Sequence, residues 1–188
     1  MAEKARNELD AIDLLLQDHR EVERLFAELK DHPEKRPLLV PVLVSVLTAH
    51  SRAEEAEVYP VAKDEAGETD EVEHSQEEHA EAEQLLAKLA GTDPTSPAFD
   101  GVLRELVESV THHVEEEESS VLPGMRERLD DRRREELGRA FAESRARHMG
   151  DRPGEATREE LLTQARNAGV SGASGMSKAQ LEKELHAS

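Results

Sequence analysis

The sequence of 188 residues contains no cysteine and no tryptophan. Without cysteine the chain can form no disulfide, iron–sulfur cluster or thiolate zinc site, so histidine and carboxylate are its strong metal ligands. The aromatic residues are three phenylalanines and one tyrosine. Apolar bulk therefore comes mainly from Leu, Val and Ala, which favours helix packing over a sheet sandwich.

Long apolar runs are also missing. No stretch reaches the roughly 18 apolar residues that a membrane helix needs. The start, MAEKARNELD, carries neither an apolar signal region nor an Arg-rich transit pattern. We therefore expect a cytoplasmic protein without a membrane segment.

Positive charge is scarce. The sequence holds 24 Lys and Arg against 43 Asp and Glu, which gives a formal net charge of −19. Such a chain is repelled by phosphate backbones and anionic lipids, so cations are its natural partners.

Four segments carry apolar residues at steps of three and four, the period of one helix face. They cover residues 8–30, 38–67, 70–90 and 98–122. Pro60 lies inside the second segment, where it should kink or nearly end the helix.

The fold that these patterns predict is all-α. We expect an up-down-up-down four-helix bundle over residues 8–125, a helical extension over 126–149 that packs on it, a linker over 150–156 and a small helical module over 157–188.

An internal repeat links the two halves of the bundle. With an offset of 60, residues 18–29 align with 78–89, and six of the twelve positions are identical. With an offset of 63, residues 48–60 align with 111–123, where Thr, His, Glu-Glu, Val and Pro coincide. Each helical hairpin thus supplies one histidine from its first helix and His-x-x-x-Glu from its second.

This repeat defines a candidate metal site. Residues four apart share one helix face, and the histidines of each hairpin lie at similar distances from its loop. The six candidate ligands are His19, His50, Glu54, His79, His113 and Glu117. Any one histidine alone fits an ordinary core position, but their common height and symmetry favour two bridged cations of iron, manganese or zinc. One tetrahedral zinc would leave two ligands unused.

Three other residues are weaker candidates. His74 lies about 140° around the helix from His79, so it is an additional metal ligand only if a π-bulge intervenes. His112 aligns with Ala49 in the repeat, which favours His113. Glu57 shares the face of His50 and either supports a metal ligand through a hydrogen bond or is a solvated charge.

The order His19, His50-x-x-x-Glu54, His79, His113-x-x-x-Glu117 resembles the hemerythrin-like HHE cation-binding proteins over about residues 10–125. The resemblance implies a non-haem di-iron centre with carboxylate bridges and, in many members, an oxo or hydroxo bridge. Manganese and zinc become less favoured. Oxygen-carrying hemerythrins use five histidines, with a pair four apart on the third helix where this chain has His74 and His79.

The tail is similar to the helix-extended-loop-helix unit at the N-terminus of transcription terminator Rho, itself like SAP modules. Thr157 and Ser177 resemble N-caps, each with an acidic or amide side chain three residues later. Residues 151–188 hold five basic and six acidic side chains. Nucleic acid or a protein is therefore a weakly supported partner for the tail.

Three functions follow as hypotheses. The first is a di-iron protein that binds or senses dioxygen, peroxide or nitric oxide. The second is an enzyme that disproportionates peroxide or oxidises ferrous iron at the same centre. The third is a stress-related interaction protein whose tail recruits nucleic acid or a partner.

Overall fold

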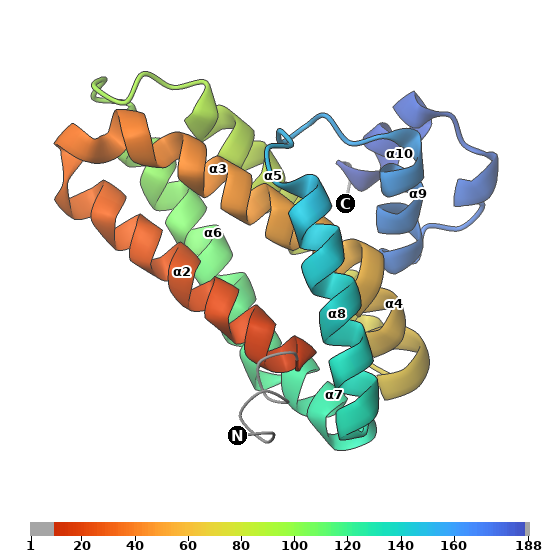
Figure 1. The fold of residues 1–188 in the computed structure, drawn as a ribbon. Helices are drawn as coiled ribbons and strands as arrows, with labels where there is room; N and C mark the ends of the chain where they lie inside the picture. The colour runs from red at the N-terminus through yellow and green to blue at the C-terminus, as the bar shows by residue number, and fades with distance from the viewer. Residues whose placement is uncertain (1–9, 187–188) are drawn as a thin grey trace, which may run out of the picture.

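The computed structural model describes residues 10–186, and every regular element in that range is helical (Figure 1). The predicted all-α fold is thereby confirmed, although the first two residues of the predicted first helix lie outside the described range. None of the helices in this range is long and apolar enough to cross a membrane. The elements are α2 (Ala11–Asp31), η1 (Pro33–Lys35), α3 (Arg36–Ala53), η2 (Glu54–Val58), α4 (Tyr59–Val61), η3 (Ala62–Ala66), α5 (Thr69–Ala90), α6 (Phe99–Ser119), α7 (Val121–Arg128), α8 (Asp131–His148), α9 (Arg158–Asn167), η4 (Ala173–Gly175) and α10 (Lys178–Leu185).

Helices α2, α3, α5 and α6 form the bundle. The hairpin of α2 and α3 packs against the hairpin of α5 and α6, with α3 beside α5 and α2 beside α6. Helix α8 lies along α3 and α2 on the outside of the first hairpin (Figure 1). This arrangement leaves the interior of the bundle to one stripe from each of the four helices.

The apolar core is divided into two clusters along the bundle. One cluster joins residues 22–29 and 40–47 to the C-terminal half of α5 and most of α6. The other joins residues 11–15 and 53–66 to Val72, α7 and α8. The predicted histidines fall between the two clusters, so the site is a polar layer with apolar packing on both sides.

The second helix of each hairpin departs from α geometry near its proline. After Ala53 the chain widens into the π-helical segment η2, returns to α geometry in α4 around Pro60 and widens again into the π-helical segment η3, which Gly67 at φ +79° ends. The helix therefore continues past Pro60, which lacks an N–H to donate to the carbonyl four residues earlier. In the other hairpin the helix breaks at Ser120, and Pro123 lies in the first turn of α7.

The tail has an apolar cluster of its own, built around Leu161, Ala165, Leu181 and partners. Capping boxes begin both of its α-helices, with Thr157 paired to Glu160 and Ser177 to Gln180. The similarity to the Rho N-terminal unit stays a prediction.

A core substitution provides a test of this packing. Leu106 is fully buried in the first cluster, whereas Leu38 on α3 is 76% exposed. Because deletion of a buried side chain leaves a cavity, we expect Leu106→Ala to lower the free energy of unfolding by about 3 kcal/mol. Leu38→Ala should change it by less than about 0.5 kcal/mol. Urea unfolding curves of the two variants would show the difference, and similar midpoints would contradict this packing.

Candidate metal centre

All six predicted ligands lie in the polar layer. His19 comes from α2, His79 from α5, the pair His113 and Glu117 from α6, and His50 from α3 with Glu54 at the first turn of η2. Their exposure is between 0 and 5%. The structure therefore brings these side chains together inside the bundle.

The inner atoms of the layer are the imidazole Nε2 atoms and the two carboxylates. Glu54 Oε2 lies 3.4 Å from Nε2 of His50 and 3.4 Å from Nε2 of His79. Glu117 Oε2 lies 3.2 Å from Nε2 of His19, and the Nε2 atoms of His79 and His113 are 3.0 Å apart. Glu54 thus contacts one histidine from each hairpin. Glu117 of the second hairpin contacts His19 of the first.

A second set of carboxylates holds the outer side of every imidazole. Asp18 contacts Nδ1 of His50 at 3.2 Å, and Glu78 contacts Nδ1 of His113 at 3.0 Å. These two contacts are equivalent in the internal repeat.

The other two outer contacts form a second equivalent pair. Glu55 lies 3.1 Å from Nδ1 of His79, and Glu118 lies 2.9 Å from Nδ1 of His19. An Nδ1–H bound to a carboxylate leaves the Nε2 lone pair directed at the centre, as in metal sites whose histidines are oriented by outer carboxylates.

The carboxylates of this layer carry buried negative charge that positive charge would stabilise. Burial alone would lower the pKa of His50 and His79, but Glu54 and the outer carboxylates outweigh it and raise these pKa values to about 9 and about 10. Burial and the charge of Glu54 raise the pKa of Glu117. The same requirement for positive charge can be met by metal ions, whose binding would release the imidazole protons.

Several inner atoms have no hydrogen-bond partner. They are buried, and they are Nε2 of His19 and both carboxylate oxygens of Glu54 and Glu117. Buried carboxylates without partners are costly, so these atoms are suited to contact a bound cation.

The distances have the scale of a coordination shell. Two nitrogens at about 2.1 Å from one cation and about 90° apart would lie about 3.0 Å from each other, which is the separation of His79 and His113. Ligand atoms of Glu54, His79 and His113 converge closely enough to share an ion. The residues present therefore fit a metal site.

Comparison with known proteins agrees with this geometry. The profile of the hemerythrin HHE cation binding domain matches residues 10–125. The chain belongs to this HHE family. Its bundle is accordingly a metal-binding domain of hemerythrin type.

A curated relative lies in the cyanobacterium Nostoc sp. (strain PCC 7120 / SAG 25.82 / UTEX 2576), where it is named DNA nickase. It is 29% identical over 154 residues, which cover 81% of this chain and 44% of the relative. The chain thus spans less than half the length of that protein. Among solved structures there is no significant match.

The three weaker candidates lie outside this HHE centre. His74 and His112 are exposed on the outer face of α5 and α6, where both contact Glu116. Glu57 lies 3.6 Å from Arg147 of α8. The π-helical segment that would have been needed near His74 occurs instead at Glu54.

Tyr59 is a central residue that the sequence did not single out for the site. Its side chain is fully buried, and its hydroxyl lies 3.1 Å from Nε2 of His79. Burial and the charges of Glu54 and Glu117 raise its pKa well above the ordinary value, so the phenol keeps its proton. The repeat pairs this position with Leu122, so the phenol occurs on one side of the centre.

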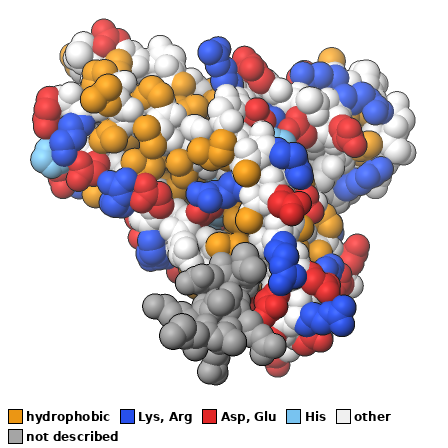
Figure 2. All heavy atoms as spheres, in the orientation of Figure 1, with side chains coloured by type: hydrophobic (Ala, Val, Ile, Leu, Met, Phe, Trp, Pro, Cys, Tyr) orange, Lys and Arg blue, Asp and Glu red, His pale blue; other side chains and the backbone are white. Residues whose placement is uncertain are grey.

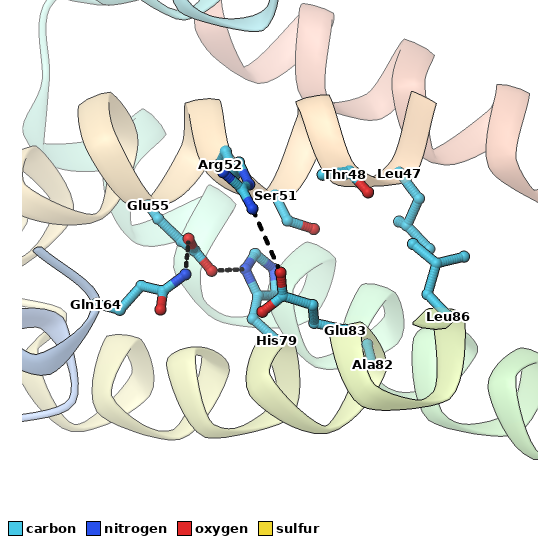
Figure 3. A pocket seen from close by; sticks show the side chains of 10 residues that line it. All are labelled: Leu47, Thr48, Ser51, Arg52, Glu55, His79, Ala82, Glu83, Leu86 and Gln164. Carbon is cyan, nitrogen blue, oxygen red and sulfur yellow. Dashed lines mark hydrogen bonds and ion pairs between the residues drawn. The ribbon is translucent and has the colours of Figure 1, made fainter. Parts of the chain in front are cut away.

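The tail is connected to the HHE centre through Glu55. Gln164 of α9 donates a hydrogen bond to Glu55 Oε2 at 2.8 Å, while Oε1 of the same carboxylate contacts His79 (Figure 3). Asn167 donates to the backbone carbonyl of Glu55 at 2.9 Å. The orientation of His79 thus depends in part on a segment more than 80 residues away in the sequence.

The outer carboxylates can be tested through metal affinity. Replacing Glu118 by Ala removes the Nδ1 partner of His19 but leaves the six candidate ligands in place. We expect the affinity for iron to fall by about 10- to 100-fold, since such partners orient the ligands. Competition with a chromophoric chelator would measure it.

A matched control is Glu115→Ala. Glu115 is an exposed glutamate on the same helix, and its loss should leave the affinity unchanged. Equal affinities of the two variants would contradict the role assigned to Glu118.

Proposed function

We propose that the chain binds two iron ions in the polar layer and that this centre binds or senses a small molecule such as dioxygen, peroxide or nitric oxide. The observation that supports a small ligand most directly is a small, largely apolar cavity next to the imidazoles of the site. The proposed iron ligands are His19, His50, Glu54, His79, His113 and Glu117.

The ligands divide into two equivalent sets. His79 and His113 of the second hairpin would hold one ion, and His19 and His50 of the first hairpin the other. Glu54 and Glu117 lie between the sets, where carboxylate bridges would reduce the repulsion between two cations. Bound iron would supply open coordination positions and redox chemistry.

The cavity has the size of a very small ligand. Its volume is about 20 Å³, and a water molecule needs at least about 10–15 Å³ of such space. The four imidazoles form one wall, and Val22, Leu47, Val110 and Val114 contribute apolar wall. A space of this kind accepts a diatomic molecule and excludes larger substrates.

A second cavity of about 20 Å³ extends the first between α3 and α5. The two share Leu47, Ser51, His79 and Ala82, and the second also reaches Arg52 and Glu83 (Figure 3). Arg52 and Glu83 form an ion pair of 3.6 Å. We infer that small molecules enter between these two helices, past that pair.

Tyr59 gives the centre a proton donor. Its hydroxyl lies next to Nε2 of His79 and outside the lining of the two cavities, so it would donate a hydrogen bond to a molecule bound beside His79 on the side of the phenol. A neutral phenol within a dry layer stabilises developing negative charge without adding charge of its own.

Metal analysis tests the iron centre. We expect protein prepared aerobically with iron to contain about two irons per chain and to show a ligand-to-metal charge-transfer band. His113→Ala and Glu117→Ala should lose the band, because each removes an inner ligand. A wild-type protein with neither iron nor band would end the proposal.

Filling the cavity tests the small ligand. Ala82 lines both cavities, so Ala82→Leu should occupy the space while leaving the iron content unchanged. We expect the affinity for nitric oxide, followed optically on ferrous protein, to fall at least tenfold. Ala87→Leu, at an exposed position of the same helix, is the control, and equal binding by both variants would contradict the cavity assignment.

A DNA-directed activity is the second candidate, because the relative from Nostoc is named DNA nickase and the alignment to it is longer than the HHE domain. The charge of this chain opposes it. On the face in Figure 2, Lys and Arg side chains alternate with Asp and Glu and form no continuous basic surface. The inner ligands are also buried.

Supercoiled plasmid separates the two candidates. We expect the protein supplemented with iron, manganese or magnesium to leave the plasmid supercoiled. The residues of the polar layer are buried, so a phosphodiester cannot reach them. Nicking that disappears in His113→Ala would establish the DNA-directed activity.

A further inference from the structure

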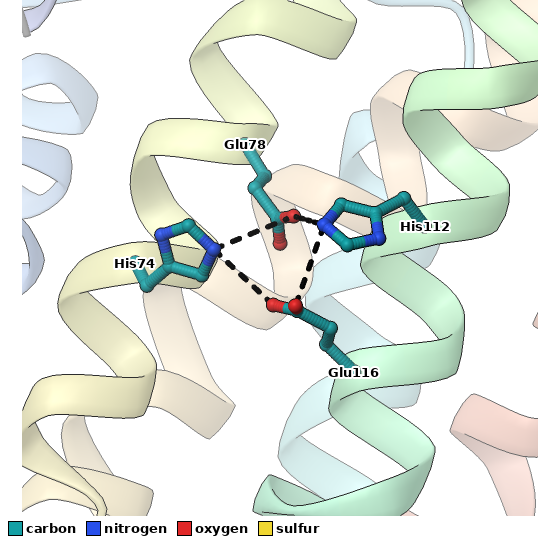
Figure 4. Close-up of side chains that lie close together, drawn as sticks. All are labelled: His74, Glu78, His112 and Glu116. Atoms are coloured by element: carbon teal, nitrogen blue, oxygen red, sulfur yellow. Dashed lines mark ion pairs between the residues drawn. The ribbon is translucent and has the colours of Figure 1, made fainter.

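Four side chains that are not among the six inner ligands meet on the outer face of α5 and α6, and one of them, Glu78, also contacts His113. His74 and Glu78 are four residues apart on α5, and His112 and Glu116 are four apart on α6, so each pair occupies one face of its helix. Figure 4 shows the two imidazoles and two carboxylates turned toward one another.

The four contacts between these side chains have similar lengths. His74 Nε2 lies 3.2 Å from Glu116 and 3.7 Å from Glu78. His112 Nε2 lies 3.3 Å from Glu116 and 3.6 Å from Glu78. Four ligand atoms about 2.0–2.1 Å from a tetrahedral ion would be about 3.3 Å apart, so a small ion fits among them with little movement.

We propose that His74, Glu78, His112 and Glu116 form a separate site for one divalent transition-metal ion, of which zinc is the reference. Two imidazoles with two carboxylates are a donor set that zinc accepts in tetrahedral geometry. The imidazoles are 55% and 62% exposed, so an ion reaches them directly from solvent. This site goes beyond the proposed function and does not require the inner iron.

The internal repeat shows that the site belongs to one hairpin alone. The equivalent positions in the first hairpin are Leu14, Asp18, Ala49 and Ala53. Ala49 and Ala53 are fully buried, and helix α8 packs along that side of the first hairpin. On the second hairpin α9 contacts α5, and Leu185 and His186 of the tail line a cavity with His74 and Glu78, but both imidazoles stay exposed.

Glu78 connects the surface site to the inner centre. Its Oε1 faces His74 and His112, while its Oε2 lies 3.0 Å from Nδ1 of His113. An ion at the surface would therefore fix the carboxylate that orients an inner ligand. Occupancy of the outer site should tighten the inner site.

Zinc binding by the full chain tests the proposal. We expect wild-type protein, dialysed against Zn²⁺ and analysed for metal, to hold one equivalent more than the double variant His74→Ala/His112→Ala. The control His32→Ala removes another exposed histidine, from the loop after α2, and should bind as wild type. Circular dichroism would check that the variants are folded.

A variant of the inner centre separates the two sites. The variant His50→Ala/Glu54→Ala/His113→Ala/Glu117→Ala removes ligands of both proposed inner ions and should still bind one zinc, and adding His74→Ala/His112→Ala should remove it. If wild type and His74→Ala/His112→Ala bind equal amounts of zinc, the surface site does not exist. If the inner centre binds no metal but the surface site exists, wild type should hold one equivalent of zinc and His74→Ala/His112→Ala should hold none.

Cobalt provides a second readout. Tetrahedral Co²⁺ absorbs strongly in the visible range, so the variant without His50, Glu54, His113 and Glu117 should develop such bands on addition of one equivalent. Bands that persist after His74→Ala/His112→Ala is added to that variant would place the ion elsewhere and overturn the assignment.

Discussion

The burial of negative charge in the middle of a helical bundle is the constraint on which the remaining structure depends. Asp18, Glu54, Glu55 and Glu117 are each at most 6% exposed, and the layers above and below them are apolar. Carboxylates in such surroundings are stable only beside cations or hydrogen-bond donors. The four imidazoles supply that positive charge when they are protonated, and metal ions can replace the protons. The HHE bundle is in this sense built around a requirement for cations.

The inner half of the site could be predicted from sequence because helical periodicity fixes faces and loop distances fix heights. Periodicity placed His79 rather than His74 toward the interior, and the alignment of His112 with Ala49 in the repeat favoured His113. Prediction of the outer carboxylates required the position of the neighbouring helix as well. Asp18 and Glu118 each follow or precede an inner ligand by one residue, which turns them about 100° toward the neighbouring helix. The repeat of acidic residues at 18/78 and 55/118 carried this signal.

Backbone irregularity was harder to foresee. A proline indicates that α geometry must change nearby, but not whether the helix ends, widens or restarts. Pro60 is accommodated by a π-helical turn that starts at Glu54, whereas Pro123 follows a break at Ser120. Because these two hairpins differ here, Glu57 faces Arg147 at the surface instead of the imidazoles. Periodicity counted in α-helical steps fails beyond such a turn.

The six candidate ligands follow the internal symmetry, but the residues that contact the outer carboxylates do not. Each outer carboxylate has a different further partner: Asp18 pairs with Arg145 of α8, Glu55 with Gln164 of the tail, Glu78 with the surface histidines and Glu118 with Arg20. Tyr59 stands on one side of the centre, opposite Leu122 in the repeat. A duplicated hairpin would by itself give two equivalent metal positions. If two ions bind as proposed, these unequal supports would make the two pairs of imidazoles differ in basicity and in hydrogen bonding, with the Tyr59 phenol beside His79 and Leu122 at the equivalent position of the other hairpin.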